Sequence, residues 1–168
     1  MAMVKASVRS RLLEPSSPAE LLQEVHRALY PLKTPNTFIT MGVLQWHSER
    51  QLECSLAGHP PLLHYSKGSR KVSEYNTANL PLGILPQQDF RGGLVPFSPG
   101  DVILILTDGF TEVFNAKAEE LGMDPVKAAF AECAERPLAE IFDYLRAKTL
   151  GFGEQSDDQT LLLVRCGD

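Results

Sequence analysis

VILILTDG, residues 102–109, is the stretch that decides the predicted fold. It opens with five consecutive aliphatic residues, three of them β-branched, which predict a strand buried on both faces. The Pro99-Gly100 pair before this strand fits the two central positions of a type II turn. Near the end of the chain, the aliphatic run at residues 160–164 predicts a second buried strand. The candidate chemistry is expected at the ends of these two strands.

Helices precede and follow the predicted strands. An amphipathic helix is predicted over residues 1–12, and the capping box at residues 17–20 starts a second helix. Two more helices are predicted to begin near Asp124 and at Pro137. The other predicted strands lie at residues 38–46, 51–57, 62–65, 71–75 and 93–97. The last of these is a short strand within residues 80–100, which are otherwise predicted to be loop. This order predicts an α+β fold with a largely antiparallel sheet, not an alternating doubly wound fold.

The composition is that of a globular domain, with 43% apolar and 22% charged residues. A formal charge of -5 argues against nucleic acid or an anionic membrane as a partner, because both attract basic surfaces. The sequence lacks an apolar run of membrane-spanning length and a signal-like N-terminus, so a cytoplasmic domain is expected. Three widely spaced cysteines indicate buried thiols in a reducing compartment rather than a disulfide framework.

Acidic residues stand at the ends of both predicted buried strands. Asp108 follows the first strand, and Asp157 and Asp158 precede the second. If the strands are antiparallel neighbours, roughly 4.8 Å apart, these carboxylates face each other at one sheet edge. A divalent cation between them would remove their repulsion, and hard oxygen ligands select Mg²⁺ or Mn²⁺. Because aspartate-glycine pairs also form ordinary turns, the spacing alone leaves both interpretations open.

A competing enzyme class can be tested at the same place. Phosphatases of the haloacid dehalogenase type also place an Asp-Gly pair after a buried strand. They require a nucleophilic aspartate two residues before that pair's aspartate, and this chain has Leu106 there. A leucine side chain cannot attack phosphorus, so the sequence excludes this class.

Five sequence blocks resemble the stage II sporulation protein E family, the bacterial branch of the type 2C (PPM) protein phosphatases. They are AGHPPLL at 57–63, LPLGI at 80–84, FSPGD at 97–101, TDGFTE at 107–112 and DDQTLL at 157–162. The ordered set, rather than any single block, carries the resemblance. It implies an αββα sandwich of two antiparallel sheets flanked by helices. It also implies that a hydroxide bound to a Mn²⁺ or Mg²⁺ pair hydrolyses phosphoserine or phosphothreonine.

The resemblance also implies roles for single residues. Asp108 and Asp157 match the family's metal ligands, Asp158 stands beside the second of these, and Gly109 is expected to let the backbone turn tightly beside the metal. In the wider family, acids for an accessory metal often occupy the positions of Glu112 and His59. For these two, a solvated acid and a turn residue are the simpler interpretations.

One family motif is missing from residues 1–56. The family has an earlier GDxxGHG-like motif whose aspartate bridges both metals, and the acids found here are Glu14, Glu20, Glu24, Glu49 and Glu53. We therefore expect residues 1–168 to be a single partial phosphatase domain, its C-terminal two-thirds, without the N-terminal strands. Weak or absent activity is expected, together with homodimerisation through the exposed sheet edge.

The family resemblance further implies a phosphorylated protein substrate, such as an anti-sigma-factor antagonist, and a sensory or receiver domain upstream in the parent chain. A non-catalytic pseudophosphatase that binds a partner or dimerises is the alternative. A ligand-binding α+β domain unrelated to phosphatases is disfavoured by the ordered blocks.

Overall fold

The computed structural model describes residues 2–11, 17–48 and 50–167. It divides into two compact units, each treated by itself below: unit 1 (Met1–His59 and Asn76–Pro96) and unit 2 (Pro60–Tyr75 and Phe97–Asp168). Whether residues 1–168 form a single partial phosphatase domain stays a prediction. Among the described residues, no helix has both the length and the apolar character needed to cross a bilayer.

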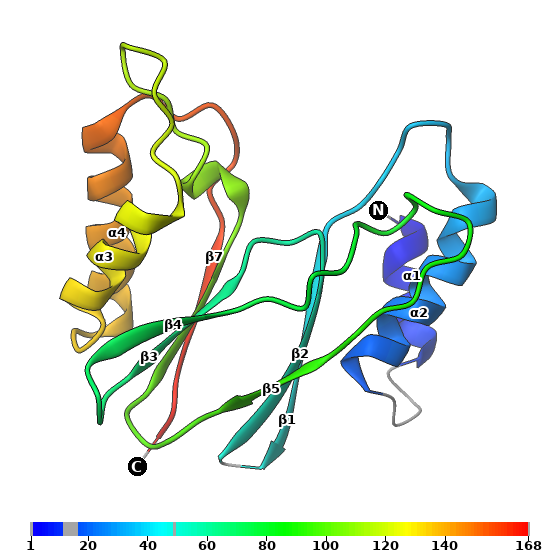
Figure 1. Cartoon of the computed structure of the whole chain (residues 1–168), viewed down its shortest axis with the longest axis horizontal. Helices are drawn as coiled ribbons and strands as arrows, with labels where there is room; N and C mark the ends of the chain where they lie inside the picture. The colour runs from blue at the N-terminus through cyan, green and yellow to red at the C-terminus, as the bar shows by residue number, and fades with distance from the viewer. Residues whose placement is uncertain (1, 12–16, 49, 168) are drawn as a thin grey trace. The chain divides into compact units, whose positions relative to one another are not determined.

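Unit 1 consists of two helices and a three-stranded antiparallel sheet (Figure 1). Its elements are α1 (Ala2–Arg11), α2 (Pro18–Leu29), η1 (Tyr30–Leu32), β1 (Met41–Ser48), β2 (Gln51–Ala57) and β5 (Gly93–Pro96), with the strands in the order β1-β2-β5. Helix α2 starts at the predicted capping box, in which Ser17 and Glu20 each bond the other's backbone N–H. Its apolar face, with Leu22 and Val25 fully buried, packs against β1 and β2.

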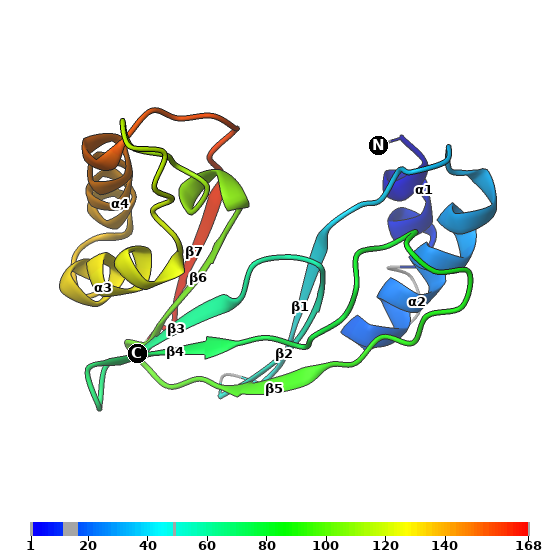
Figure 2. The same ribbon diagram turned by 45° about the horizontal axis from the view of Figure 1, so that its top comes forward.

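Unit 2 consists of a four-stranded antiparallel sheet with two helices on one face (Figure 2). Its elements are β3 (Leu62–Ser66), β4 (Lys71–Tyr75), β6 (Val102–Leu106), η2 (Asp108–Phe110), α3 (Met123–Cys133), α4 (Leu138–Phe152) and β7 (Leu161–Arg165). The strand order is β4-β3-β6-β7, and the helix-facing core contains Leu104, Phe110, Phe130 and Ile141. As predicted, β6 is buried along its whole length and pairs with β7 in antiparallel register.

The prediction that β7 is a buried strand was wrong for one of its faces. Leu162 is 52% exposed, whereas its neighbours Leu161 and Leu163 pack against the helix-facing core. The exposure of Leu162 follows from the position of β7, which is the outer strand of its sheet. Only the face of β7 that carries Leu161 and Leu163 is packed against the core. The α+β class with antiparallel sheets is confirmed.

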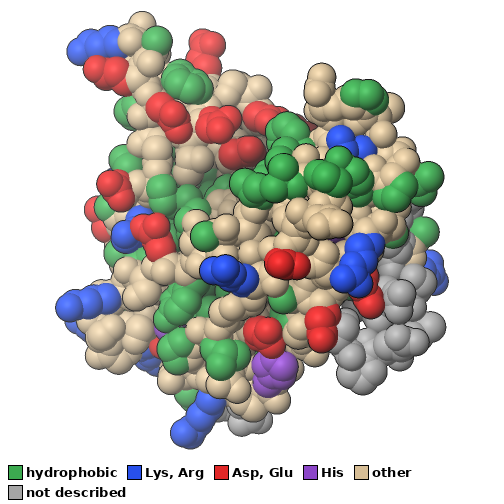
Figure 3. Space-filling model, turned by 45° about the vertical axis from the view of Figure 1, so that its right-hand side comes forward, with side chains coloured by type: hydrophobic (Ala, Val, Ile, Leu, Met, Phe, Trp, Pro, Cys, Tyr) green, Lys and Arg blue, Asp and Glu red, His purple; other side chains and the backbone are tan. Residues whose placement is uncertain are grey.

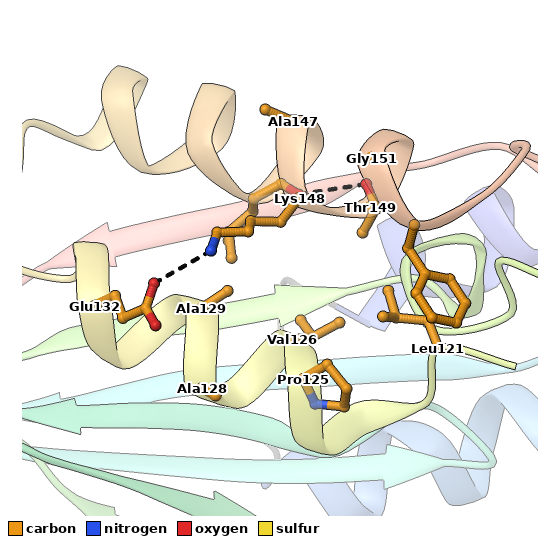
Figure 4. A pocket seen from close by; sticks show the side chains of 12 residues that line it. Leu121, Pro125, Val126, Ala128, Ala129, Glu132, Ala147, Lys148, Thr149 and Gly151 are labelled. Carbon is orange, nitrogen blue, oxygen red and sulfur yellow. Dashed lines mark hydrogen bonds and ion pairs between the residues drawn. The ribbon is translucent and has the colours of Figure 1, made fainter. Parts of the chain in front are cut away.

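An apolar hollow of about 510 Å³ lies between α3 and α4 (Figure 4). Val126 and Ala129 line it from α3, Leu145 lines it from α4, and a Glu132–Lys148 ion pair of 3.5 Å lies at its side. None of the predicted site residues is among its lining residues. The candidate chemistry therefore has to be sought at the sheet edge.

Candidate metal centre

Asp108 stands where β6 gives way to the short helix η2. Thr107 keeps the extended conformation of the strand, and the carbonyl of Asp108 then accepts backbone hydrogen bonds from Thr111 and Glu112, both of 2.8 Å. These bonds fix the backbone of Asp108 while its side chain stays exposed. The buried strand thus delivers a carboxylate to solvent at a fixed point of the sheet edge.

Thr107 connects this turn to the segment that carries the other acids. Its N–H donates to the Thr160 carbonyl at 2.9 Å, and its hydroxyl donates to the Asp158 carbonyl at 3.0 Å. The hydroxyl also accepts from the Thr160 N–H at 3.0 Å. The antiparallel ladder of β6 and β7 is therefore prolonged by side-chain bonds as far as Asp158.

Gly109 lies against the same segment. A methyl group added at Gly109 would lie 2.5 Å from the carbonyl oxygen of Asp158 and 3.2 Å from that of Asp157. The amide of Gln159 donates to the Gly109 carbonyl at 2.9 Å, which holds the two turns together. The structure therefore brings the backbone beside Asp108 close to that of Asp157 and Asp158 at one edge of unit 2. That their carboxylates face each other around a metal stays a prediction.

Gly109 was expected to allow a tight backbone turn, but the structure gives a different reason for a glycine at this position. Gly109 is not among the described glycines with positive φ, which are Gly58, Gly83, Gly100 and Gly122. It belongs to η2, and the close approach of the Asp158 backbone is what excludes a side chain. The tight packing of two turns, rather than a special backbone conformation, sets the requirement.

The exposed carboxylates of this edge fit a divalent cation. Asp108, Asp157 and Asp158 are all exposed, and acidic side chains gather on the upper surface in Figure 3. The buried Oε1 atom of Gln159 has no hydrogen-bond partner within the described residues. No group of three acidic, histidine or cysteine side chains suited to a metal occurs among these residues. Mg²⁺ commonly takes one or two carboxylates and completes its shell with water, so two loops suffice for such an ion.

Asp157 is itself held in place by local bonds. One of its carboxylate oxygens accepts the Asp158 N–H at 2.7 Å, and its carbonyl accepts from the Gln155 amide at 2.9 Å. Of the two neighbouring acids, Asp157 therefore has the more fixed side chain.

Glu112 and His59 differ in how they relate to this edge. Glu112 is exposed one helical turn after Asp108, and its carbonyl accepts from the Ser156 hydroxyl at 2.9 Å. His59 belongs to unit 1, directly after Gly58, where β2 has ended. Roles for both in an accessory metal site stay predictions.

Sequence reasoning missed the residues that bind the two turns to each other. These are Thr107, Gln159 and Ser156, together with Gly153, where an added methyl group would lie within 2.1 Å of the Phe114 carbonyl. The only available signal was their position inside or beside the TDG and DDQT blocks. Their bonds span more than forty residues, so local periodicity cannot reveal them.

Comparisons with known proteins identify the family of the chain. The family model described as Stage II sporulation protein E (SpoIIE) matches residues 1–167. Phosphoserine phosphatase RsbU of Bacillus subtilis is 25% identical over 169 residues, which cover 98% of this chain and 50% of that protein. The chain thus spans about half the length of this curated relative.

Solved structures show the same fold. The SiaA-PP2C domain of Pseudomonas aeruginosa superposes with a TM-score of 0.80 at 23% identity, over 98% of this chain and 65% of that one. The RsbU and RsbW domains of Rv1364c from Mycobacterium tuberculosis superpose with a TM-score of 0.80 at 25% identity, over 99% of this chain and 47% of that one. The expected two-sheet fold is therefore confirmed.

Proposed function

Because the chain belongs to the stage II sporulation protein E family, we propose that it is part of a metal-dependent protein serine/threonine phosphatase. The observation that carries the proposal is the contact of Gly109 with the backbone of Asp157 and Asp158. This contact supports a shared site for acids from two distant parts of the sequence. The relative named a phosphoserine phosphatase supports the reaction class.

Each residue of the edge has a distinct task in this proposal. Asp108 and Asp157 hold Mn²⁺ or Mg²⁺, with Asp158 beside them. Accessory-metal roles for Glu112 and for His59, which belongs to unit 1, stay predictions. A bound ion of this kind lowers the pKa of its water and so supplies hydroxide for attack on phosphorus. Thr107 and Gln159 fix the spacing of the two turns. Gly109 has no side chain, and this lets the two turns approach each other closely.

The substrate that we propose is a phosphorylated protein, such as an anti-sigma-factor antagonist. The names of the RsbU relative and of the RsbU and RsbW domains support this class of regulation. A sensory or receiver domain in the parent chain and a cytoplasmic location belong to the same proposal. The net charge of -5 disfavours nucleic acid and anionic membranes as partners of this chain.

A non-catalytic pseudophosphatase is the alternative. It is favoured by the observation that the described residues bring no three metal-binding side chains together. A scaffold of this kind keeps the fold and the contact between the two turns, and it acts by binding a partner. Metal binding and turnover have to be measured separately to distinguish the two functions.

Crystals of the chain soaked in Mn²⁺ are expected to show an anomalous-scattering peak between Asp108 and Asp157. Hydrolysis of a phosphoserine peptide by this chain is expected to be weak, whereas the parent protein hydrolyses it in a Mn²⁺-dependent way. A peak without turnover in the parent protein supports the pseudophosphatase. If no peak lies at these acids, the metal centre proposed here is wrong.

We also propose a homodimer formed through an exposed sheet edge. In unit 2, β7 is an outer strand of its sheet, and an outer strand can pair with a strand of another chain. The strand also carries the exposed Leu162. Sedimentation is expected to give the mass of a dimer, and Leu162→Lys is expected to shift it toward monomer. The matched control is Leu150→Lys, at an exposed position on α4. A strictly monomeric wild-type chain would contradict this proposal.

A further inference from the structure

His26 is a buried histidine in unit 1 with no part in the proposed metal centre. It lies on α2 and is only 1% exposed. Its ring packs between those of Tyr30 and Phe90, each with its centre 5.6 Å away. Phe90 ends a segment of eight residues, Gly83–Phe90, which we call the latch segment. The histidine therefore lies beneath a loop that is distant in sequence.

The ring accepts a hydrogen bond from the start of the latch segment. The Gly83 N–H donates to His26 Nδ1 at 3.2 Å, across 57 residues of sequence. An accepting Nδ1 carries no proton, so the neutral ring has its proton on Nε2. This tautomer follows from the hydrogen-bond network. The bond exists only while the ring is neutral.

The latch segment has few other attachments. Leu82, just before it, is fixed by two backbone bonds with Ile39, of 3.0 and 2.8 Å. Beyond Gly83, residues 84–87 are exposed, and the Gln88 amide donates at 2.7 Å to Leu80, within the same loop. Segments with exposed backbone and few packed side chains open locally at low free energy. This segment meets His26 through the Gly83 N–H, the Phe90 ring and the carbonyls of Leu85 and Pro86.

We propose that His26 is an acid-sensitive latch that holds residues 83–90 on α2 and releases them when its ring is protonated. Protonation of Nδ1 would set two donors, the ring N–H and the Gly83 N–H, against each other. It would also place a charge in a buried apolar setting, which is unfavourable without a partner. The carbonyls of Leu85 and Pro86 compensate for that charge only in part.

The surroundings of the ring determine the direction of the pH effect. Burial lowers the pKa of His26 below its ordinary value of 6.5, and the carbonyls of Leu85 and Pro86 offset this only in part. The charged groups on the neighbouring elements are Glu24 and Arg27 on α2, Lys33 on the connection after it, and Asp89 on the latch segment. Lys33 lies over the Tyr30 ring, 5.4 Å from its centre. The causes of the pKa shift are burial and the two carbonyls, not these charges.

The sign of the effect follows from the lowered pKa. Well above pH 6.5 the ring is neutral in both the latched and the released state, so the latch is at full strength. As the pH falls below 6.5, the released state takes up a proton that the latched state excludes. The opening constant then rises by up to about tenfold per pH unit, until the pKa of the latched state is reached.

Hydrogen exchange measured by mass spectrometry on the whole chain tests the latch. Between pH 7.5 and 5.5, with exchange corrected for its intrinsic pH dependence, peptides covering residues 83–90 are expected to lose protection. Peptides covering β6 and β7 are expected to keep theirs. If protection of 83–90 does not change, or if it falls equally in both units, the proposal is overturned.

Two variants separate the latch from other histidine effects. His26→Asn places an acceptor oxygen where Nδ1 stands but does not titrate, so the pH dependence is expected to disappear. His47→Asn is the control, because His47 lies half-exposed on β1, paired with Glu53 at 2.8 Å, and its loss is expected to leave the dependence intact. If His26→Asn does not fold, long-range ¹H–¹⁵N spectra of the wild type decide the question. A protonated Nδ1 at pH 7.5 would contradict the latch.

Discussion

Replacement of Asp108 with asparagine is expected to lower the proposed Mn²⁺-dependent phosphatase turnover by at least about a hundredfold. Loss even of residues that only orient metal ligands costs about 10–100-fold in affinity or activity, and loss of a charged ligand costs more. The fold is expected to persist, because the Asp108 side chain is exposed and its backbone carbonyl makes the structural bonds. Turnover and Mn²⁺ affinity are measured side by side.

The matched control for this variant is Asp143→Asn. Asp143 is an exposed aspartate on α4 and is not one of the candidate ligands, so it removes the same charge from the surface. Its turnover and Mn²⁺ affinity are expected to match the wild type. If Asp108→Asn keeps wild-type Mn²⁺ affinity, Asp108 is not a ligand. If Asp143→Asn loses as much activity, net charge explains the effect.

The sequence predicts those parts of the fold that depend on local patterns. The capping box at Ser17 and Glu20 satisfies orphan N–H groups at a helix start, and it does so with neighbouring residues. Likewise the φ of +83° at Gly100 is the conformation that the Pro99-Gly100 turn requires. Such features need no knowledge of the rest of the chain.

Features set by long-range order were harder to predict. An aliphatic strand looks the same in the centre of a sheet and at its edge, so β7 was expected to be as buried as β6. The division of the chain into two units also escapes local patterns. Residues 76–96 return to unit 1 after the β3–β4 hairpin, and only the spatial pairing of β5 with β2 reveals this.

In the candidate site, too, local sequence features could be predicted, whereas long-range contacts could not. Acids at strand ends could be found, because aliphatic runs mark the two strands. The antiparallel pairing of β6 with β7 was assumed, and the structure confirms it. The bonds from Thr107 to Asp158 and from Gln159 to Gly109 could not be found, because they join side chain to backbone across about fifty residues. The ligand roles of the acids themselves await the metal measurements.

Gly109→Ala is expected to lower the free energy of unfolding by about 1–3 kcal/mol, as overpacking of a tight contact does. The added methyl group would lie 2.5 Å from the Asp158 oxygen and 3.0 Å from its carbonyl carbon. Both are backbone atoms that side-chain rotation cannot move. The two turns have to separate, and the carboxylates of Asp108 and Asp157 separate with them. Urea denaturation measures the first effect, and Mn²⁺ titration is expected to show a weaker affinity.

Gly151→Ala is the control that isolates the contact from the loss of a glycine. Gly151 lies in α4, and a methyl group added there would meet no atom within 4 Å. Alanine favours a helix by about 1 kcal/mol over glycine, so this variant is expected to be slightly more stable and to bind Mn²⁺ as the wild type does. Opposite signs for the two variants would assign the instability of Gly109→Ala to the contact between the turns. If Gly109→Ala is as stable as Gly151→Ala, the turns do not touch as described, and the argument for a shared metal edge loses its support.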